Sequence, residues 1–561
     1  MREIDRLTTE RYDIPSLTLM ENAATAVTRA VTAHLAGDLT GKRILVLCGK
    51  GNNGGDGAAA ARLLATNGAR VDVVLLAKLQ ATKGDAQTNL ERLRLWIDEQ
   101  AFRENRETAA GDLGAINLFE CDSKQAWDQL LAGILGLPYD AAIDALFGTG
   151  LTRPIEGIHK EAVKYLRRLH QMRDSSEGSH TPIISVDVPS GLDSDSTELI
   201  GETVHADSTV TMTTPKTANV LPPAASSNGK LIVADIGSPV ELIEQAKSQL
   251  FVIEAADAHR WLIQTRFTPD SYKNMHGHAL VIAGSRGFTG AAALCGNAAM
   301  TAGAGLVTVA TSVSVQPLVA TQVMPEVMTT ALVETDRGAV SDEAIDYVIK
   351  FAERVNVIAI GPGLSSKDER THKFVLAVVE QRKTPVVIDA DGLNCLAPWP
   401  TELRGSSDHP IVLTPHPGEM LRLLGTENKS ALDDKVAAAR EFATSHEVIL
   451  VLKGTRSLIA VPDGRVFINP AGNAGLGTAG AGDTLTGIIT GFLAQAYGTL
   501  GDDADAIDAV IAALYVGGLA GDLAARELGM RAMVASNIRE HLSEAIRLLD
   551  PWGEAPPGSS V

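Results

Sequence analysis

Short runs of apolar, largely β-branched residues alternate with longer amphipathic segments along the whole chain. In the first half, the runs at 43–48, 70–76, 141–147 and 182–188 predict strands, and the runs at 207–214 and 230–236 predict two more. Nearly continuous apolar runs of this length are typical of strands that are buried on both faces of a parallel sheet. The pattern therefore predicts an α/β fold for this half.

The second half repeats the pattern. Its predicted strands are the runs at 278–284, 305–311, 355–361, 385–390, 410–415 and 447–454. Residues 457–469 predict a hairpin that turns on Pro-Asp-Gly at 462–464. We expect the two α/β halves to join within 238–262, where no long or disordered linker is present.

Length, charge and cysteine usage narrow the class of protein. A chain of 561 residues exceeds one compact core, and two large α/β domains fit it. The net charge of −19 argues against a general affinity for nucleic acid or anionic membrane, because both need clustered Lys and Arg. No uninterrupted apolar run reaches the ~18 residues of a membrane span. Four scattered cysteines and a charged N-terminal stretch predict a reduced, cytoplasmic setting.

Three polar, glycine-containing segments follow predicted strands of the first half, and ligands gather at the carboxyl edge of parallel sheets. The first is Asn52–Gly57, where glycines in a loop would let backbone N–H groups and a following helix approach a phosphate. The second is Asp144 with Gly148–Gly150, and the third is Asp187 with Ser190. Taken singly, each could be an ordinary turn. Together, their Asn, Asp and Ser oxygens could surround a weakly held, monovalent cation.

The segment 472–487 carries the sharpest chemical signal of the second half. Asp483 directly follows Gly480, Ala481 and Gly482, and a helix is predicted from there. Successive N–H groups at a helix N-terminus bind an anion, and a carboxylate beside them could take a proton from a substrate hydroxyl. Phosphoryl transfer needs little more than such positioning and charge stabilisation. A purely structural role as the helix N-cap is the alternative for this aspartate.

Other strand-end loops of the second half carry candidate ligands as well. Lys453 to Ser457 could reach a nucleotide phosphate, although the lysine could equally be an ordinary surface residue. His416 stands between two prolines just before a predicted helix with Glu419 in its first turn, which favours a ligand contact over core packing. The segments 361–364 and 389–394 end two more strands, and the two aspartates of the latter could be structural.

The order of these motifs resembles the bifunctional NAD(P)H-hydrate repair enzymes, in which an epimerase domain precedes an ADP-dependent dehydratase domain. The resemblance covers nearly the whole chain, from "MREID" and "IPSLTLMENAA" through "NNGGDG", "IDALFGTGLTRP" and "DVPSGLD" to "GFTGAAAL", "GAGLVTV", "GPGL", "DADGLN", "LTPHPGE", "LKGTRS" and the Gly-Asp segment. It implies a Rossmann-like three-layer epimerase domain at 1–245, a ribokinase-like dehydratase domain at 255–550 and a flexible tail at 551–561.

The resemblance also implies roles for individual residues. In the first domain, the residues that would contact the hydrated dinucleotide are Asn52, Asn53, Gly54, Gly55, Asp56, Gly148, Thr149, Gly150, Leu151, Thr152, Arg153, Pro154 and Asp187, and those that would contact a potassium ion are Asn53, Asp144 and Ser190. In the second, the same substrate would contact Ala292 (or its neighbour Ala291), Gly363, His416 and Asp483, and the adenine nucleotide would contact Lys453, Gly454, Thr455, Arg456, Ser457 and Gly482.

Some positions depart from the family pattern. The family often has glycine where Ser365 stands, and Ala474, Ala479 and Ala481 replace its usual proline, glycine and threonine. These small-for-small changes put the fine geometry of the loop before Asp483 in question more than its role.

The implied reaction is the repair of hydrated NADH and NADPH. The first domain would interconvert the R and S hydrates, with Asp187 as a candidate catalytic residue. The second would dehydrate the S form with ADP and Mg²⁺, giving AMP and phosphate, with Asp483 deprotonating the ring hydroxyl. We expect small-molecule partners only, no nucleic acid or membrane, and a homo-oligomer. The alternatives are a small-molecule kinase of the ribokinase-like type and, for the first half, a non-catalytic nucleotide-binding module.

Overall fold

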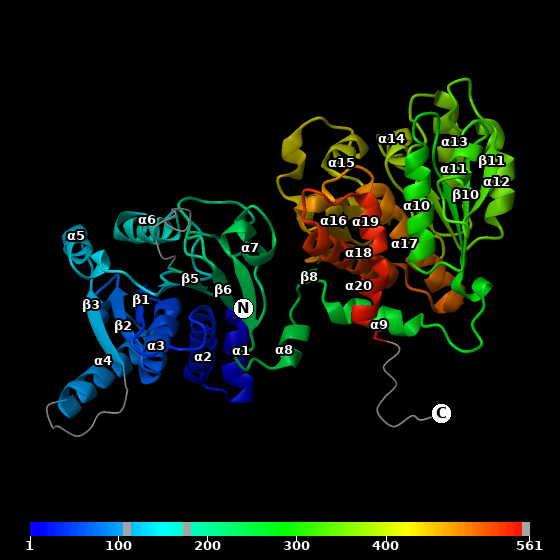
Figure 1. The fold of residues 1–561 in the computed structure, drawn as a ribbon. Coiled ribbons are helices and arrows are strands. Elements are labelled where there is room, and N and C mark those ends of the chain that lie inside the picture. Colours follow the sequence, from blue (N-terminus) through cyan, green and yellow to red (C-terminus); the bar gives the residue numbers. More distant parts are fainter. Residues whose placement is uncertain (105–113, 172–180, 552–561) are drawn as a thin grey trace. The chain divides into compact units, whose positions relative to one another are not determined.

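The computed structural model describes residues 1–104, 114–171 and 181–551 (Figure 1). The chain divides into two compact units, Met1–Lys247 and Ser248–Val561. The tail predicted for 551–561 lies outside the described residues except for Pro551.

The first unit is built on a seven-stranded sheet in the order β3-β2-β1-β4-β5-β6-β7, and every pair of neighbours is parallel. This is the doubly wound order of Rossmann-like folds, extended by one strand. The strands are β1 (Arg43–Cys48), β2 (Arg70–Leu75), β3 (Ala115–Glu120), β4 (Ala141–Ala145), β5 (Ile183–Val186), β6 (Ser208–Met212) and β7 (Lys230–Ala234).

Helices cover both faces of this sheet (Figure 1). Alternate residues of β1 point to opposite faces: Ile44 and Val46 pack against one group of helices, and Leu45 and Leu47 against another. The first group is α2 (Ser16–His34), α3 (Asn52–Thr66) and α4 (Gly84–Glu104), and the second is α5 (Lys124–Ala132) and α6 (Gly157–Gln171). The remaining helices are α1 (Arg2–Tyr12), α7 (Thr217–Val220) and α8 (Val240–Glu244).

The second unit has a ten-stranded sheet in the order β11-β10-β9-β12-β13-β14-β15-β16-β17-β8. The pairings from β11 to β15 are parallel, and the predicted hairpin forms the antiparallel pair β16 and β17. The strands are β8 (Leu250–Val252), β9 (His278–Ile282), β10 (Leu306–Ser312), β11 (Met328–Leu332), β12 (Val357–Ile360), β13 (Val386–Ile388), β14 (Ile411–Leu413), β15 (Ile449–Leu452), β16 (Leu458–Ala460) and β17 (Val466–Ile468).

Helices cover this sheet too, and the largest core of the unit lies between the sheet and α9, α10, α17 and α18. The helices are α9 (Ala255–Gln264), α10 (Thr289–Thr301), α11 (Gln316–Ala320), α12 (Ile345–Ala352), α13 (Glu369–Glu380), α14 (Asp391–Cys395), α15 (Pro417–Leu423), α16 (Lys435–His446), α17 (Ala481–Thr499), α18 (Ala506–Leu528), α19 (Ala535–Glu540) and α20 (Leu542–Leu549). Among the described helices, only α18 is long and apolar enough to cross a membrane, but 72% of its most apolar stretch is buried inside the protein.

Every strand predicted from the apolar runs is present, and both halves are α/β as predicted. Three strands were missed: β3, β8 and β11. Each lies at an edge of its sheet, where side chains are partly exposed and the apolar run is interrupted.

Candidate functional sites

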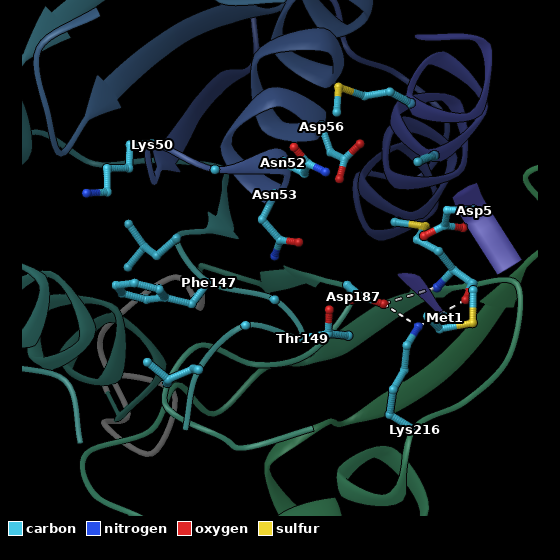
Figure 2. A pocket seen from close by; sticks show the side chains of 18 of the residues that line it. Met1, Asp5, Lys50, Asn52, Asn53, Asp56, Phe147, Thr149, Asp187 and Lys216 are labelled. Atoms are coloured by element: carbon cyan, nitrogen blue, oxygen red, sulfur yellow. Dashed lines mark hydrogen bonds and ion pairs between the residues drawn. The ribbon is translucent and has the colours of Figure 1, made fainter. Parts of the chain in front are cut away.

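The first unit has a pocket of about 800 Å³ at the carboxyl ends of β1, β4, β5 and β6 (Figure 2). It gathers residues from all three polar segments that the sequence singled out. The predicted substrate contacts that line it are Asn52, Asn53, Asp56, Gly148, Thr149, Gly150, Leu151, Arg153, Pro154 and Asp187. Gly54, Gly55 and Thr152 are not part of the lining. The three polar segments therefore lie together at the carboxyl edge of the sheet and line one pocket.

The glycines of "NNGGDG" do not form the predicted loop. Helix α3 begins at Asn52, so Gly54, Gly55 and Gly57 belong to its first turns. A Cβ added to Gly54 would lie 1.8 Å from the carbonyl oxygen of Gly49, and one on Gly57 would lie 2.6 Å from the Cβ of Ala145. These glycines let the start of the helix pack directly on the strand ends.

Of the three predicted cation ligands, Asn53 lines the pocket, while Asp144 and Ser190 are hydrogen-bonded to each other and are not part of its lining. Asp144 is fully buried and accepts hydrogen bonds from Ser185 Oγ (2.8 Å), Ser190 N (2.8 Å), Ser190 Oγ (2.6 Å) and Leu146 N (3.4 Å). Burial raises the pKa of Asp144, and the bonds from Ser190 and Ser185 oppose that shift. Asn53 donates through Nδ2 to the carbonyl of Val186 (2.7 Å), which turns its Oδ1 toward Gly148.

This donor set consists of one carboxylate and several neutral oxygens. Such a set suits a monovalent cation better than a divalent one, which prefers several carboxylates. The described residues contain no group of three or more His, Cys, Asp or Glu side chains placed to hold a metal ion. The cluster therefore fits the predicted potassium ion in chemistry.

Charged side chains line the pocket as well. Asp187 Oδ1 accepts a hydrogen bond from Lys216 Nζ at 2.5 Å, and both residues are 8% exposed. Asp56 is also 8% exposed, and its pKa is raised well above the ordinary range by burial and by the nearby carboxylates of Asp187 and Asp5. Lys216 was missed by the sequence analysis. Its only signal was a lysine placed just after the predicted strand 207–214.

The second unit has a pocket of about 890 Å³ between the loop after β15, residues 469–478 and the start of α17. All the predicted nucleotide contacts line it, namely Lys453, Gly454, Thr455, Arg456, Ser457 and Gly482, and so does His416. The sequence placed these residues in two segments nearly thirty positions apart, and the fold brings them to one cavity.

Helix α17 begins at the predicted anion-binding segment. Its N-cap is Gly480, with φ 83°, and a Cβ there would lie 2.5 Å from Leu294 Cδ1. Asp483 is in the first turn and makes no capping hydrogen bond, so the N-cap alternative is excluded. Burial, helped by Asp389, raises the pKa of Asp483 to about 6, while Lys453 opposes the shift. A carboxyl with this pKa is suited to act as a general base near neutral pH.

A buried ion pair holds Lys453 beside this helix start. Lys453 Nζ donates to Asp389 Oδ1 at 2.7 Å, and Thr486 Oγ1 of α17 donates to Asp389 Oδ2 at 2.7 Å. A Cβ built on Gly482 would lie 3.2 Å from Lys453 Nζ. The ammonium group therefore sits against the first turn of α17, where backbone N–H groups already favour an anion. The surface-lysine alternative is excluded, because this side chain is only 19% exposed.

The remaining predicted contacts are arranged less uniformly. His416 is the N-cap of α15: its Nδ1 accepts from Gly418 N (3.0 Å) and Glu419 N (3.3 Å), and half of the ring stays exposed. Ala292 is fully buried inside the unit. A Cβ on Gly363 would lie 2.9 Å from the Cβ of Ala291, so Ala291 is the alanine that lies beside Gly363.

Within the described part of the chain, the carboxylates near Asp483 are not grouped as a set of three or more metal ligands. Asp389 is committed to Lys453 and Thr486, and Asp391 accepts hydrogen bonds from Ser365 N (2.9 Å) and Ser366 Oγ (3.1 Å). Mg²⁺ in nucleotide sites is held mainly by phosphate oxygens and waters with one or two carboxylates. Asp483, in the first turn of α17, could supply such a carboxylate.

Each unit thus has a pocket at the carboxyl ends of its parallel strands. One pocket is lined by carboxyl groups and the other by an anion-binding helix start. These features are typical of an α/β enzyme with two sites for small nucleotide substrates. Sequence comparison specifies the class further. The family profile described as NAD(P)H-hydrate dehydratase matches residues 279–544, and the one described as YjeF-related protein N-terminus matches residues 16–218.

Three relatives are described as bifunctional NAD(P)H-hydrate repair enzymes. The one from Moorella thermoacetica is 39% identical over 98% of this chain and 96% of its own length. Those from Thermofilum pendens (35% identical, 97% and 95%) and Escherichia coli (31% identical, 97% and 93%) are matched over comparable shares. The chain belongs to the family of bifunctional NAD(P)H-hydrate repair enzymes, which confirms the resemblance.

Two solved structures each match about half of the chain. The ADP/ATP-dependent NAD(P)H-hydrate dehydratase of Bacillus subtilis is 30% identical, with 54% of this chain and 99% of that chain covered and a TM-score of 0.45. A ribokinase-like superfamily protein of Enterococcus faecalis is 26% identical, with 54% and 98% covered and a TM-score of 0.46.

Proposed function

We propose that the chain repairs hydrated NADH and NADPH at two sites. The first unit would interconvert the R and S hydrates, and the second would use ADP to dehydrate the S form, releasing AMP and phosphate. The observation that carries the proposal is the start of α17, where Asp483, with a pKa of about 6, lies beside an anion-binding turn and the buried Lys453.

The chemistry assigned to this site follows from its charges. Asp483 takes the proton of the ring hydroxyl as the oxygen attacks the terminal phosphoryl group of the nucleotide. The backbone N–H groups of the first turn of α17 and the Lys453 ammonium stabilise the negative charge that develops on that group. Mg²⁺, when bound with the nucleotide, would neutralise further phosphate charge. Phosphate then leaves with the electrons of its C–O bond, and the neighbouring ring carbon gives up a proton, which restores the double bond of the dihydronicotinamide.

The residues around each pocket receive their roles within this proposal. Lys453–Ser457 and Gly482 would hold the nucleotide, with the hydrated ring near Gly363, Ala291 and His416. In the first unit, the lining residues of Figure 2 would hold the hydrated dinucleotide. Asn53, Asp144 and Ser190 would hold a potassium ion, with Ser190 Oγ redirecting its proton away from Asp144.

The test supplies an R and S mixture of hydrated NADPH with ADP and Mg²⁺ to the purified chain, while the dihydronicotinamide absorbance is followed. Recovery of the whole mixture is expected, because the first unit would keep replenishing the S form. No recovery would refute the dehydratase assignment, and a stable phosphorylated product would favour a kinase instead. Replacing K⁺ by Na⁺ should slow epimerisation, and an unchanged rate would refute the potassium site.

A further inference from the structure

The proposed epimerase site contains a buried carboxyl group with no partner. The side chain of Asp56 makes no hydrogen bond or ion pair with any described residue, although it is 8% exposed and lines the pocket. A charged carboxylate in such a place is costly, so burial and the neighbouring carboxylates favour its protonated form. Asp56 is therefore a proton donor that points into the pocket.

Asp187 lies in the opposite electrostatic environment. Lys216 Nζ donates to its Oδ1 at 2.5 Å, Thr211 Oγ1 at 3.3 Å and Met212 N at 3.4 Å. All three of these bonds end on Oδ1. Asp187 thus lines the pocket with a lysine ammonium group on one of its oxygens, an arrangement in which a carboxylate can receive a proton from a substrate.

Lys216 itself is not available to the substrate. Besides Asp187, its ammonium group donates to Thr211 Oγ1 (2.9 Å) and to the carbonyl of Met212 (3.0 Å), which uses all three of its protons. Asp187 also holds φ at 67°, in the left-handed region that few non-glycine residues adopt. The backbone and the lysine thus fix the carboxylate in one orientation.

The two carboxyl groups lie on different sides of the pocket. Figure 2 shows Asp56 on α3 and the Asp187–Lys216 pair across from it, with the open pocket beside them. A carboxyl group whose surroundings favour its protonated form, facing one that is paired with a lysine, is an arrangement suited to acid–base catalysis.

We propose, on the basis of the function proposed above, that Asp56 and Asp187 are the catalytic acid and base of the epimerase site, and that Lys216 is the positioning residue that orients Asp187. Hydration of an enamine places the hydroxyl on the carbon next to the ring nitrogen. Asp56 gives a proton to this hydroxyl, the C–O bond breaks with its electrons on the departing water, and the nitrogen lone pair forms a C=N⁺ bond.

Inversion is completed from the other face. A water molecule there gives a proton to Asp187 as its oxygen forms the new C–O bond, and the C=N⁺ electrons return to nitrogen. One water leaves, one enters, and nothing is oxidised or reduced. The proton has moved from Asp56 to Asp187, and exchange with solvent restores the starting state.

The experiment uses the full chain and the isolated R hydrate without ADP, so that dehydration is silent, and follows R-to-S conversion by chromatography above the spontaneous rate. Asp56→Asn, Asp187→Asn and Lys216→Met should each lower kcat about 100-fold or more, with little change in KM. Lys216→Arg keeps a cation beside Asp187 and should recover part of the rate. In water enriched in heavy oxygen, each inversion should exchange the hydroxyl oxygen.

Arg43→Met is the matched control. Arg43 pairs with the buried Asp72 at 2.8 Å in the same sheet but does not line the pocket. This variant should epimerise normally, and all the variants should still dehydrate the S hydrate with ADP. A Lys216→Met variant with an unchanged rate, an Arg variant as slow as the Met variant, or retention of the original oxygen would overturn the proposal. A wild-type chain that dehydrates but does not epimerise would instead refute the proposed function of the first unit.

Discussion

Replacing Asp483 by asparagine should abolish dehydration and, at the same time, make the second unit more stable. Burial and the charge of Asp389 raise the pKa of Asp483 from about 3.8 to about 6. Each unit of pKa is worth about 1.4 kcal/mol, so keeping this carboxylate charged destabilises the folded state by up to about 3 kcal/mol. Asparagine has nearly the same shape and carries no charge, so the folded variant is not destabilised by a buried charge.

The pH dependence of this effect has a definite sign. Well below pH 4 the carboxyl is protonated in both the folded and the unfolded chain, so wild type and variant should be equally stable there. Between pH 4 and pH 6 the unfolded chain ionises while the folded chain still holds its proton, which favours the unfolded wild type. The advantage of the variant should therefore grow across this window and stay constant above it.

Thermal unfolding of wild type and variant at several pH values measures the effect, and a rise of several degrees is expected at pH 7. Dehydration of the S hydrate should fall at least 100-fold in the variant. Asp505→Asn is the control, because Asp505 is the N-cap of α18 and asparagine caps a helix equally well. A variant that is no more stable at pH 7, or whose advantage is the same at pH 4, would refute the raised pKa. A variant that still dehydrates would refute the role as base.

Three further predictions follow from the same structure. The dehydration rate should rise about tenfold from pH 5 to pH 7 as Asp483 ionises, and a rate that is flat above pH 5 would contradict this. Gly54→Ala should lower the free energy of unfolding of the first unit by about 1–3 kcal/mol, because the new Cβ would lie 1.8 Å from the carbonyl oxygen of Gly49. Urea titration measures this loss. Gly51→Ala is the control and should have little effect, because its new Cβ would have no atom within 4 Å. Ser365 has φ 68°, in the left-handed region that disfavours residues other than glycine. Ser365→Gly should therefore raise the free energy of unfolding of the second unit by up to about 1 kcal/mol. A measured decrease would show that the serine is not strained.

Apolar runs identified the strands buried in the middle of each sheet, because both faces of such strands must be apolar. They did not identify β3, β8 and β11 at the sheet edges, where half-exposed positions tolerate polar residues. The family, the α/β class and the repair function predicted from the motifs are confirmed by the comparisons. The domain limits, the roles of the individual site residues and the potassium ion stay predictions.

The sequence by itself determined which segments carry chemistry, because glycines, carboxylates and prolines at strand ends are visible as local patterns. Only the tertiary structure decided how these groups act on one another. The glycines of "NNGGDG" turned out to be packing positions inside a helix, since their role depends on what lies against them. Lys216 and Asp389 acquire their roles from the carboxylate and the lysine they meet across the fold. Burial and neighbouring charge set the pKa of Asp56 and of Asp483, and neither is written in the local sequence.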